Sequence, residues 1–264
     1  MAFMQVDFFS EVLGMCTHMN VILPEENKGA IGIGGTEQKD GWKVLYLLHG
    51  LSDDYTIWQR RTSIERYVSG KPIVVVMPET QRGWYTDMKY GFKWFTYFTE
   101  ELPVIVKNFF PRVSTKREDT FVAGLSMGGY GAMKLALRLP GQYAAAASLS
   151  GALDVAELFG EKPGLMNDTE AENVFGDVKT IRGSDNDVFT LARKVAEESV
   201  RPRLYMWCGT EDFLYWQNVR MRNLLKGLDY DLTYEESSGD HQWKYWDAKI
   251  QNVLNWLMPE GEGK

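Results

Sequence analysis

Continuous apolar segments bounded by glycine or proline recur along the chain. Four to eight apolar residues flanked in this way are typical of strands buried on both faces of a sheet. Two further strands are expected near the N-terminus, separated by a turn at Gly14. The expected strands are QVDFF (5–9), HMNVILP (18–24), KVLYLLHG (43–50), KPIVVVMPE (71–79), DTFVAGLS (119–126), AAAASLSG (144–151), RPRLYMWCG (201–209) and DLTYEE (231–236).

Between these strands the apolar positions recur at helical spacing. The expected helices cover residues 96–110, with a kink near Pro103, and residues 127–139, 188–198, 215–228 and 243–258. Strands and helices therefore alternate, and the first two strands are joined by a short turn. This pattern predicts an α/β fold with a mostly parallel sheet, helices on both faces and an antiparallel N-terminal edge.

One α/β domain covering residues 1–264 is the expected organisation. With 264 residues, of which 44% are hydrophobic and 25% charged, the chain can bury most of its apolar surface in a single core. The segment 152–187 is longer and less regular than the other connections. We expect it to pass over the active-site face of the sheet rather than to form a second domain.

Charge, cysteine content and the absence of certain motifs limit which partners, location and cofactors are expected. The formal net charge of −7 disfavours nucleic acid and anionic membranes as partners. The N-terminal residues do not resemble a signal peptide, and no apolar stretch approaches the roughly 20 residues of a membrane span. Cys16 and Cys208 are the only cysteines, which favours free thiols in a reducing cytoplasm. The sequence contains no metal-ligand or dinucleotide motif, so no cofactor is expected.

The chemistry is concentrated in the stretch FVAGLSMGGYGAMKLAL (121–137). Gly124-Leu125-Ser126-Met127-Gly128 matches the G-x-S-x-G nucleophile elbow, in which a strand turns sharply into a helix. A side chain two positions before or after the serine would collide with the neighbouring strand and helix, and glycine removes both collisions. The motif lies between a predicted strand and a predicted helix, so Ser126 is the candidate nucleophile.

A serine nucleophile needs a base, and the chain has three histidines. His18 lies at the start of an early strand and is expected to be structural. His49 ends the strand KVLYLLHG, where the following loop is expected to supply the oxyanion hole. His241 lies in a late loop before the last helix, which is the place of the base in the order Ser…Asp/Glu…His. His241 is therefore the favoured base.

The acid that orients the base is expected in the loop after the penultimate strand. That loop offers Glu211 and Asp212, and Asp212 is favoured because it directly precedes the next helix. Glu211 is expected to be a solvated neighbour. Asp154 is the rival, because some enzymes of this order carry the acid one strand earlier.

Two backbone N–H groups are expected to bind the oxyanion that develops during acyl transfer. They belong to Leu51, in the turn after the strand that ends at Gly50, and to Met127, directly after the nucleophile. Aromatic side chains flank the predicted site loops and are candidates to line a substrate cleft, although aromatic residues are more often part of the core. These candidates are Trp58, Trp84, Tyr85 and Trp243.

Nearly the whole chain resembles the esterase D group of α/β-hydrolases. The resemblance rests on VLYLLHGLSDDYTIW, GWYTD, ELPVIVKNFFP, FVAGLSMGGYGAMKLAL, AAAASLSG and GDHQWKYWD, and it is greatest to the tributyrin-esterase branch. The group also includes S-formylglutathione hydrolases and feruloyl and acetylxylan esterases. The resemblance implies a serine carboxylesterase for short acyl esters, with a triad of Ser126, Asp212 and His241. It also implies an oxyanion hole at Leu51 and Met127, and copies of the chain that assemble into a dimer or tetramer.

Two alternatives to a carboxylesterase remain. A thioesterase for S-formylglutathione is disfavoured at two places, because members of that branch usually carry Ser-Gly-Leu-Thr-Cys where this chain has residues 49–53, and His where it has Tyr130. A non-catalytic binding module on the same fold is disfavoured by the intact triad. Action on long acyl chains would need an apolar lid, and the segment 152–187 is too polar to provide one.

Overall fold

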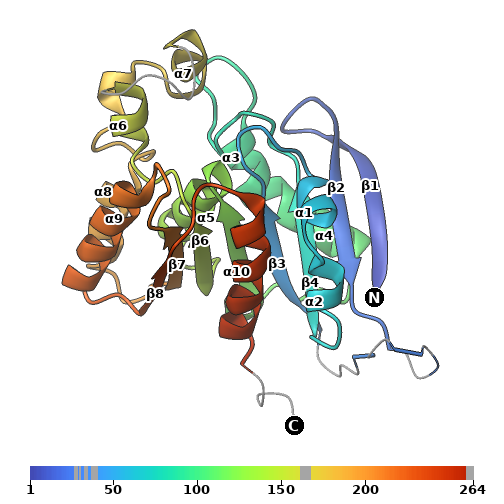
Figure 1. The fold of residues 1–264 in the computed structure, drawn as a ribbon. Coiled ribbons are helices and arrows are strands. Elements are labelled where there is room, and N and C mark those ends of the chain that lie inside the picture. Colours follow the sequence, from blue (N-terminus) through green and yellow to red (C-terminus); the bar gives the residue numbers. More distant parts are fainter. Residues whose placement is uncertain (27–28, 30, 33–34, 37–40, 161–167, 260–264) are drawn as a thin grey trace.

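An eight-stranded sheet forms the centre of the protein in the computed structural model, which describes residues 1–26, 29, 31–32, 35–36, 41–160 and 168–259 (Figure 1). The strands are β1 (Ala2–Ser10), β2 (Met15–Leu23), β3 (Lys43–Leu48), β4 (Ile73–Pro78), β5 (Thr120–Leu125), β6 (Ala145–Leu149), β7 (Arg203–Gly209) and β8 (Leu232–Ser237). Their order across the sheet is β1-β2-β4-β3-β5-β6-β7-β8. Strands β3 to β8 are parallel, whereas β1 and β2 form an antiparallel edge, as predicted.

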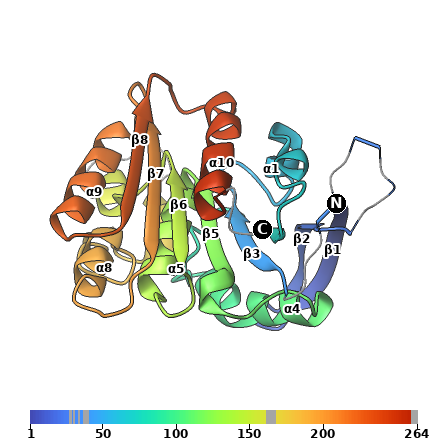
Figure 2. The same cartoon turned by 90° about the horizontal axis from the view of Figure 1, so that it is seen from below.

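Helices cover both faces of this sheet (Figure 2). One face packs against α4, α5, α8 and α9, and the other packs against α1, α2 and α10. The helical segments are α1 (Ile57–Arg61), α2 (Ile64–Tyr67), α3 (Trp94–Thr96), η1 (Tyr97–Glu101), α4 (Leu102–Phe109), η2 (Arg117–Asp119), α5 (Met127–Arg138), α6 (Val155–Gly160), α7 (Asp168–Phe175), η3 (Val178–Thr180), α8 (Val188–Val195), α9 (Tyr215–Gly227) and α10 (Trp243–Leu257). The short helices α1 and α2 were not predicted from the sequence.

The continuous apolar segments result from burial on two sides. In β4, Val74 and Val76 pack into the core on one face of the sheet, while Ile73, Val75 and Met77 pack into the core on the other. Alternate side chains of a strand point to opposite faces, so a strand covered on both faces must be apolar throughout. This is why the central strands could be located from the sequence.

The kink expected near Pro103 takes the form of a π-helical turn just before it. In this turn the Leu102 N–H donates to the carbonyl of Tyr97, five residues back. Pro103 then lies in the first turn of α4, directly after this π-helical turn. The helix therefore continues through the proline after an adjustment of one residue.

The described parts of the segment 152–187 comprise α6, α7 and η3, and they lie beyond the end of the sheet at the top of Figure 1. Residues 161–167, part of the polar stretch noted in the sequence, lie outside the described residues. The apolar side chains of α6 and α7 turn inward. The ring centroid of Phe159 lies 5.0 Å from that of Trp84 and 5.4 Å from that of Phe175.

Helix α5 holds the end of this segment through two buried side chains. The Tyr130 hydroxyl donates to the Asn186 carbonyl at 2.9 Å, and the Lys134 Nζ donates to Asn186 Oδ1 at 2.7 Å. The Lys134 amine also donates to Thr86 Oγ1 at 2.7 Å. Burial lowers the pKa of Lys134 well below its ordinary value, because a charge is costly away from water. The helix that carries the candidate nucleophile is thus tied directly to the segment above the sheet.

Candidate active site

Ser126 occupies the turn between β5 and α5 with φ 51° and ψ −117°. The flanking glycines are needed for steric reasons, as expected. A Cβ at Gly124 would lie 2.4 Å from the Gly128 carbonyl oxygen, and a Cβ at Gly128 would lie 2.5 Å from the Leu48 carbonyl oxygen. Both distances are shorter than atoms can approach, so the turn can close around the serine only if these positions are glycine.

His241 joins Ser126 to Asp212 by two hydrogen bonds. Its Nδ1 lies 2.8 Å from Asp212 Oδ2, and its Nε2 lies 3.0 Å from Ser126 Oγ. The carboxylate can only accept, so Nδ1 carries the proton and Nε2 is left to accept the serine hydroxyl. The His241 side chain is 19% exposed whereas that of Asp212 is fully buried, so the hydroxyl end of the relay faces solvent.

Asp212 is held in the short turn between β7 and α9. Its Oδ1 accepts the Leu214 N–H at 2.9 Å, and its own N–H donates to the Gly209 carbonyl at 3.2 Å. The carboxylate therefore has one oxygen fixed by the backbone and the other directed at His241. A carboxylate held in this way restricts the imidazole of His241 to one orientation and one tautomer.

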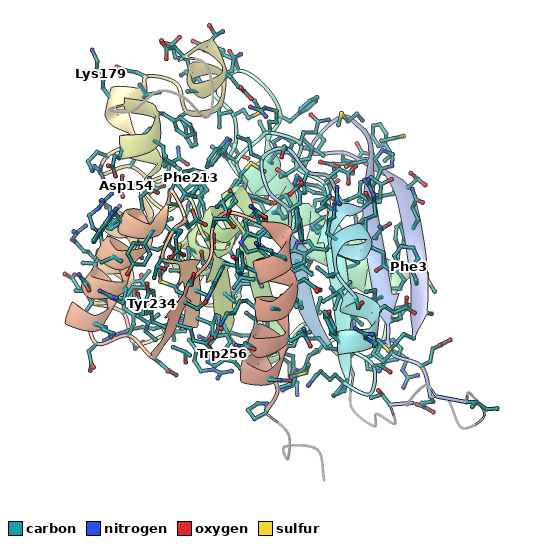
Figure 3. The ribbon with its side chains drawn as sticks, viewed as in Figure 1. Phe3, Asp154, Lys179, Phe213, Tyr234 and Trp256 are labelled. Atoms are coloured by element: carbon teal, nitrogen blue, oxygen red, sulfur yellow. The ribbon has the colours of Figure 1, made fainter. Side chains whose placement is uncertain are left out.

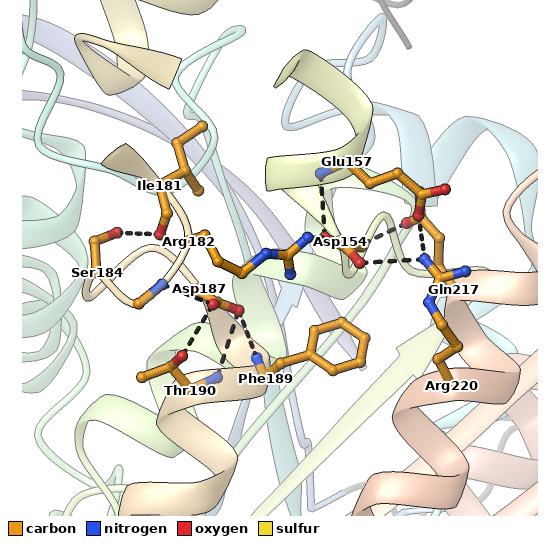
Figure 4. A network of polar contacts seen from close by, with 11 residues as sticks. Asp154, Glu157, Ile181, Arg182, Ser184, Asp187, Phe189, Thr190, Gln217 and Arg220 are labelled. Atoms are coloured by element: carbon orange, nitrogen blue, oxygen red, sulfur yellow. Dashed lines mark hydrogen bonds and ion pairs between the residues drawn. The ribbon is translucent and has the colours of Figure 1, made fainter. Parts of the chain in front are cut away.

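Asp154, the rival acid, binds two arginines instead (Figure 4). Its Oδ1 lies 2.9 Å from Arg182 Nη2, and its Oδ2 lies 3.1 Å from Arg220 Nη2. Its backbone N–H donates to Gln217 Oε1 at 3.0 Å. In the described part of the chain Asp154 makes no hydrogen bond with His241, and its contacts join the segment 152–187 to α9.

The other two histidines lie apart from this relay. His18 in β2 contacts Asp7 in β1 and stacks on Tyr55, with ring centroids 5.2 Å apart. His49 is buried, and its Nδ1 donates to the Gly50 carbonyl at 2.8 Å.

Met127 and Leu51 carry the two backbone amides that are expected to form an oxyanion hole. Met127 is the first residue of α5, a position where N–H groups have no intrahelical partner. Leu51 follows the end of β3. This part of the chain lies against the start of α5, as shown by the 2.6 Å between a Cβ placed at Gly128 and the His49 carbonyl oxygen. Among the described residues, the Leu51 N–H donates no hydrogen bond.

The expectation that Trp58, Trp84 and Tyr85 line a cleft is wrong. All three side chains are at most 1% exposed. The Trp58 Nε1 donates to the Leu48 carbonyl at 3.0 Å, and the Tyr85 hydroxyl donates to the His49 carbonyl at 2.9 Å. Large rings with one polar atom are most stable where the ring is buried and that atom finds a backbone partner. Proximity to the site loops in the sequence does not fix the direction of a side chain.

Trp243 is half-buried and packs edge-on against Trp58 and Trp246, with ring centroids 5.1 and 5.4 Å away. Trp246 in turn lies edge-on to His241, with ring centroids 4.8 Å apart. The aromatic residues of α10 therefore support the His241 ring.

Phe213 is an exposed aromatic residue at the site, and it was not predicted from the sequence. Its side chain is 60% exposed, and its ring centroid lies 4.6 Å from that of His241. Figure 3 shows Phe213 at the end of the sheet near α6. The available signal was an aromatic residue directly after the candidate acid, in an otherwise polar turn.

Glu211 is not merely a solvated neighbour of Asp212, as the sequence had suggested. Its carboxylate accepts the Gly239 N–H and the Ser238 hydroxyl, and its own N–H donates to the Gly239 carbonyl at 3.0 Å. These contacts join the turn that carries Asp212 to the loop that carries His241. The hydrogen bond from Gly239 is the main cause that lowers the pKa of Glu211.

Comparison with known proteins gives one family match over most of the chain. The model of the esterase family, described as "Putative esterase", matches residues 10–257. An acetyl esterase of Caldicellulosiruptor saccharolyticus is 33% identical over 263 residues, which cover 97% of this chain and 98% of that protein.

Two solved structures from Staphylococcus aureus are similar over nearly their whole length. One is FphF, a fluorophosphonate-binding serine hydrolase with bound substrate, at 34% identity and a TM-score of 0.87. The other is the S-formylglutathione hydrolase FrmB, at 34% identity and a TM-score of 0.84. Each alignment covers 97% of this chain and 98% of the other, and the shared architecture is the α/β-hydrolase fold.

The described residues offer neither a membrane-spanning helix nor a metal site. No helix there is long and apolar enough to cross a membrane. Within the same ranges, no group of three or more His, Cys, Asp and Glu side chains is arranged to hold a metal ion.

The contacts of Glu211 predict a pH effect on stability. Its pKa is lowered in the folded protein, so its contribution is present above the ordinary value of 4.5 and is lost as the pH falls through the folded pKa. Glu211→Gln should therefore be less stable than wild type at pH 7 and lose less stability as the pH falls below about 4.5. Urea unfolding from pH 7 downward measures this, with Glu197→Gln as an exposed control. Parallel pH curves for wild type and Glu211→Gln would contradict it.

Proposed function

The chain belongs to the esterase family and is an ester hydrolase, and from this we propose that it is a serine carboxylesterase that hydrolyses short-chain acyl esters through an acyl-enzyme. The observation that carries the proposal is the pair of hydrogen bonds that links Ser126, His241 and Asp212. A hydroxyl next to an unprotonated imidazole nitrogen, whose other nitrogen is held by a buried carboxylate, is the arrangement that activates a serine.

In the proposed reaction, Ser126 Oγ attacks the ester carbonyl while its proton passes to His241 Nε2. The negative oxygen of the tetrahedral intermediate accepts hydrogen bonds from the N–H groups of Leu51 and Met127. Collapse of this intermediate breaks the bond to the alcohol, which takes the proton from Nε2. Water then attacks the acyl-serine by the same steps and releases the acid. Asp212 stabilises the imidazolium in both halves of the reaction.

The size of the acyl group is inferred from the segment above the sheet. Phe159, Val174 and Phe175 are buried in the core, so they offer little apolar surface to a long acyl chain. We therefore propose acetyl and other short acyl groups. The relative of 33% identity is an acetyl esterase, which agrees with this choice.

A thioesterase for S-formylglutathione is the second candidate. It is favoured by the 34% identity and the TM-score of 0.84 to FrmB. It is disfavoured by His49 and Tyr130, which stand where that branch usually carries other residues. We further propose a cytoplasmic enzyme that acts on small-molecule esters, on the basis of its net charge of −7 and its two free cysteines.

Ser126→Ala should abolish ester hydrolysis and leave the fold intact. Loss of a triad nucleophile typically lowers turnover by about 10⁶-fold, because no other group can form the acyl-enzyme. The hydrolysis of 4-nitrophenyl acetate measures this, and circular dichroism checks the fold. Retention of a tenth of the wild-type rate by a folded variant would contradict the assignment.

Substitution of the two candidate acids should have clearly different effects on turnover. Asp212→Asn should lower turnover about 10⁴-fold, because an amide favours the wrong imidazole tautomer and cannot stabilise the imidazolium. Asp154→Asn should stay within about tenfold of wild-type turnover. It should also lose about 1–3 kcal/mol of unfolding free energy, since its buried carboxylate binds two arginines. A greater loss of turnover in the Asp154 variant would reverse the assignment.

The rate should fall as the acyl chain lengthens beyond about six to eight carbons, because little apolar surface is available to bury a longer tail. The measurement is kcat/KM for 4-nitrophenyl esters from acetate to decanoate, together with ethyl ferulate, acetylated xylo-oligosaccharide and S-formylglutathione. A rate that rises through decanoate would argue against short acyl groups. Preference for S-formylglutathione over every oxygen ester would favour the second candidate.

Phe213 should contact the departing alcohol, because that alcohol takes its proton from the adjacent His241. Phe213→Ala should lower kcat/KM for 4-nitrophenyl acetate about 2- to 10-fold relative to ethyl acetate, as expected for one lost aromatic contact. Phe3→Ala is the control, since Phe3 is 43% exposed on β1 at the opposite edge of the sheet (Figure 3). Equal losses for the aryl and alkyl esters would show that Phe213 does not contact the alcohol.

A further inference from the structure

The loop that carries Leu51 is held by side chains at each of the three carbonyls before it. These buried donors come from different segments of the chain. The Leu48 carbonyl accepts from Trp58, the His49 carbonyl accepts from Tyr85, and the Gly50 carbonyl accepts from the His49 ring. The Asp53 N–H adds a second hydrogen bond to the Gly50 carbonyl at 3.2 Å.

The hydrogen bonds to Gly50 determine where the Leu51 N–H points. The described chain contains no cis peptide bond, so the Gly50 carbonyl and the Leu51 N–H point in opposite directions from one rigid plane. The His49 Nδ1 holds the carbonyl at 2.8 Å. The N–H is consequently turned away from the buried His49 ring, and rotation of this peptide would break the bond.

On the other side of the His49 ring, Nε2 accepts the Thr80 N–H at 3.1 Å and faces the carboxylate of Glu79, the residue directly after β4. Its Oε1 lies 3.2 Å from His49 Nε2. The same oxygen accepts the Thr80 N–H at 3.0 Å and the Gln81 N–H at 2.5 Å, and Oε2 accepts the Tyr55 N–H at 3.3 Å. Nδ1 must carry a proton because it faces a carbonyl. Nε2 carries no proton in this arrangement, because it accepts the Thr80 N–H.

The balance of forces on Glu79 keeps its carboxylate charged. Burial is the largest single influence and would raise its pKa. The contact with His49 and the N–H groups of Gln81 and Tyr55 together outweigh burial and lower the pKa overall. Asp53 is the other carboxylate at this loop. Its Oδ2 accepts the Gly50 N–H at 3.3 Å, and burial raises its pKa.

The chain that follows Glu79 is strained. Gln81, Trp84 and Tyr85 all have positive φ, between 50° and 52°. Such conformations are rare for bulky residues and persist only where the surroundings enforce them. Glu79 binds the N–H at the start of this segment, and Tyr85 near its end binds the loop before Leu51. The strained segment therefore serves to bring both side chains to that loop.

We propose that His49 is a positioning residue for acyl transfer, which aims the Leu51 N–H at the developing oxyanion while the Thr80 N–H, next to Glu79, fixes the other side of the His49 ring. This rests on the proposed function, in which Leu51 is an oxyanion donor. His49 acts through the backbone and never touches the substrate, since it is 1% exposed.

A pair of substitutions separates positioning from stability. His49→Asn can place an amide donor where Nδ1 lies but cannot reach Glu79. His49→Gln can reach Glu79 but leaves the Gly50 carbonyl without its side-chain donor. If His49 positions the Leu51 N–H, the Gln variant should lose about 10²-fold in kcat, and the Asn variant should stay within about tenfold of wild type. The Asn variant should nevertheless be the less stable of the two, because the Thr80 N–H and Glu79 lose their contact with the buried ring.

The decisive readout is the binding of two matched inhibitors. A trifluoromethyl ketone forms a hemiketal with the nucleophilic serine and needs the oxyanion hole, whereas the corresponding methyl ketone binds without forming it. The Gln variant should bind the trifluoromethyl ketone about 10²-fold more weakly than wild type and the methyl ketone equally well. Equal losses in both variants, or no loss in the Gln variant, would overturn the positioning role.

Wild-type measurements keep the test valid if either variant fails to fold. Nitrogen-15 NMR of labelled histidine, with His18→Gln to aid assignment, should find a proton on Nδ1 of His49. An unprotonated Nδ1 would overturn the proposal. A wild-type protein that neither hydrolyses esters nor binds the trifluoromethyl ketone would instead refute the proposed function. Normal wild-type chemistry together with an insensitive Gln variant would refute only the role of His49.

Discussion

The geometry of the whole site depends on the backbone conformation of Ser126. A non-glycine residue with φ 51° costs on the order of 1–3 kcal/mol and needs surroundings that enforce it. Its N–H donates to the Leu149 carbonyl at 3.0 Å, and its carbonyl accepts from Tyr130 and Ala152 at 3.1 and 3.0 Å. The strand β6 and the helix α5 thus hold the turn from both sides. The hydroxyl is fixed in front of the helix N-terminus, where N–H groups are unpaired.

The parallel sheet brings the remaining groups to that hydroxyl. Leu48 pairs with Gly124, and Gly209 pairs with Ser237, so the segments after β3, β5, β7 and β8 leave the same edge of the sheet. Asp212 and His241 are joined twice at this edge, through their own hydrogen bond and through the contacts of Glu211 with the loop before His241. The order of the strands therefore determines which loops lie close together at the site. Local hydrogen bonds determine the positions of the side chains that these loops carry.

The sequence predicted the features that follow from local pattern. Buried strands produce continuous apolar segments, and the glycine spacing around Ser126 reflects the collisions that a Cβ at Gly124 or Gly128 would make. Features that depend on side-chain direction or on distant partners were not predictable. Trp58 and Tyr85 turn inward because their polar atoms bind carbonyls of the loop before Leu51. The contact between His49 and Glu79 joins residues 30 positions apart, and nothing local indicates it. Likewise, the π-helical turn before Pro103 resolves a local conflict that the sequence showed only as a kink.

The proposed reaction requires that Ser126 is the nucleophile and that two backbone amides hold its tetrahedral adduct. A crystal structure of the protein with a bound trifluoromethyl ketone tests this most directly. It should show a covalent bond from Ser126 Oγ to the ketone carbon, with the former carbonyl oxygen roughly 2.7–3.1 Å from both the Leu51 and Met127 nitrogens. A ketone attached to another residue, or a Ser126 adduct whose oxygen points away from those two amides, would contradict the account.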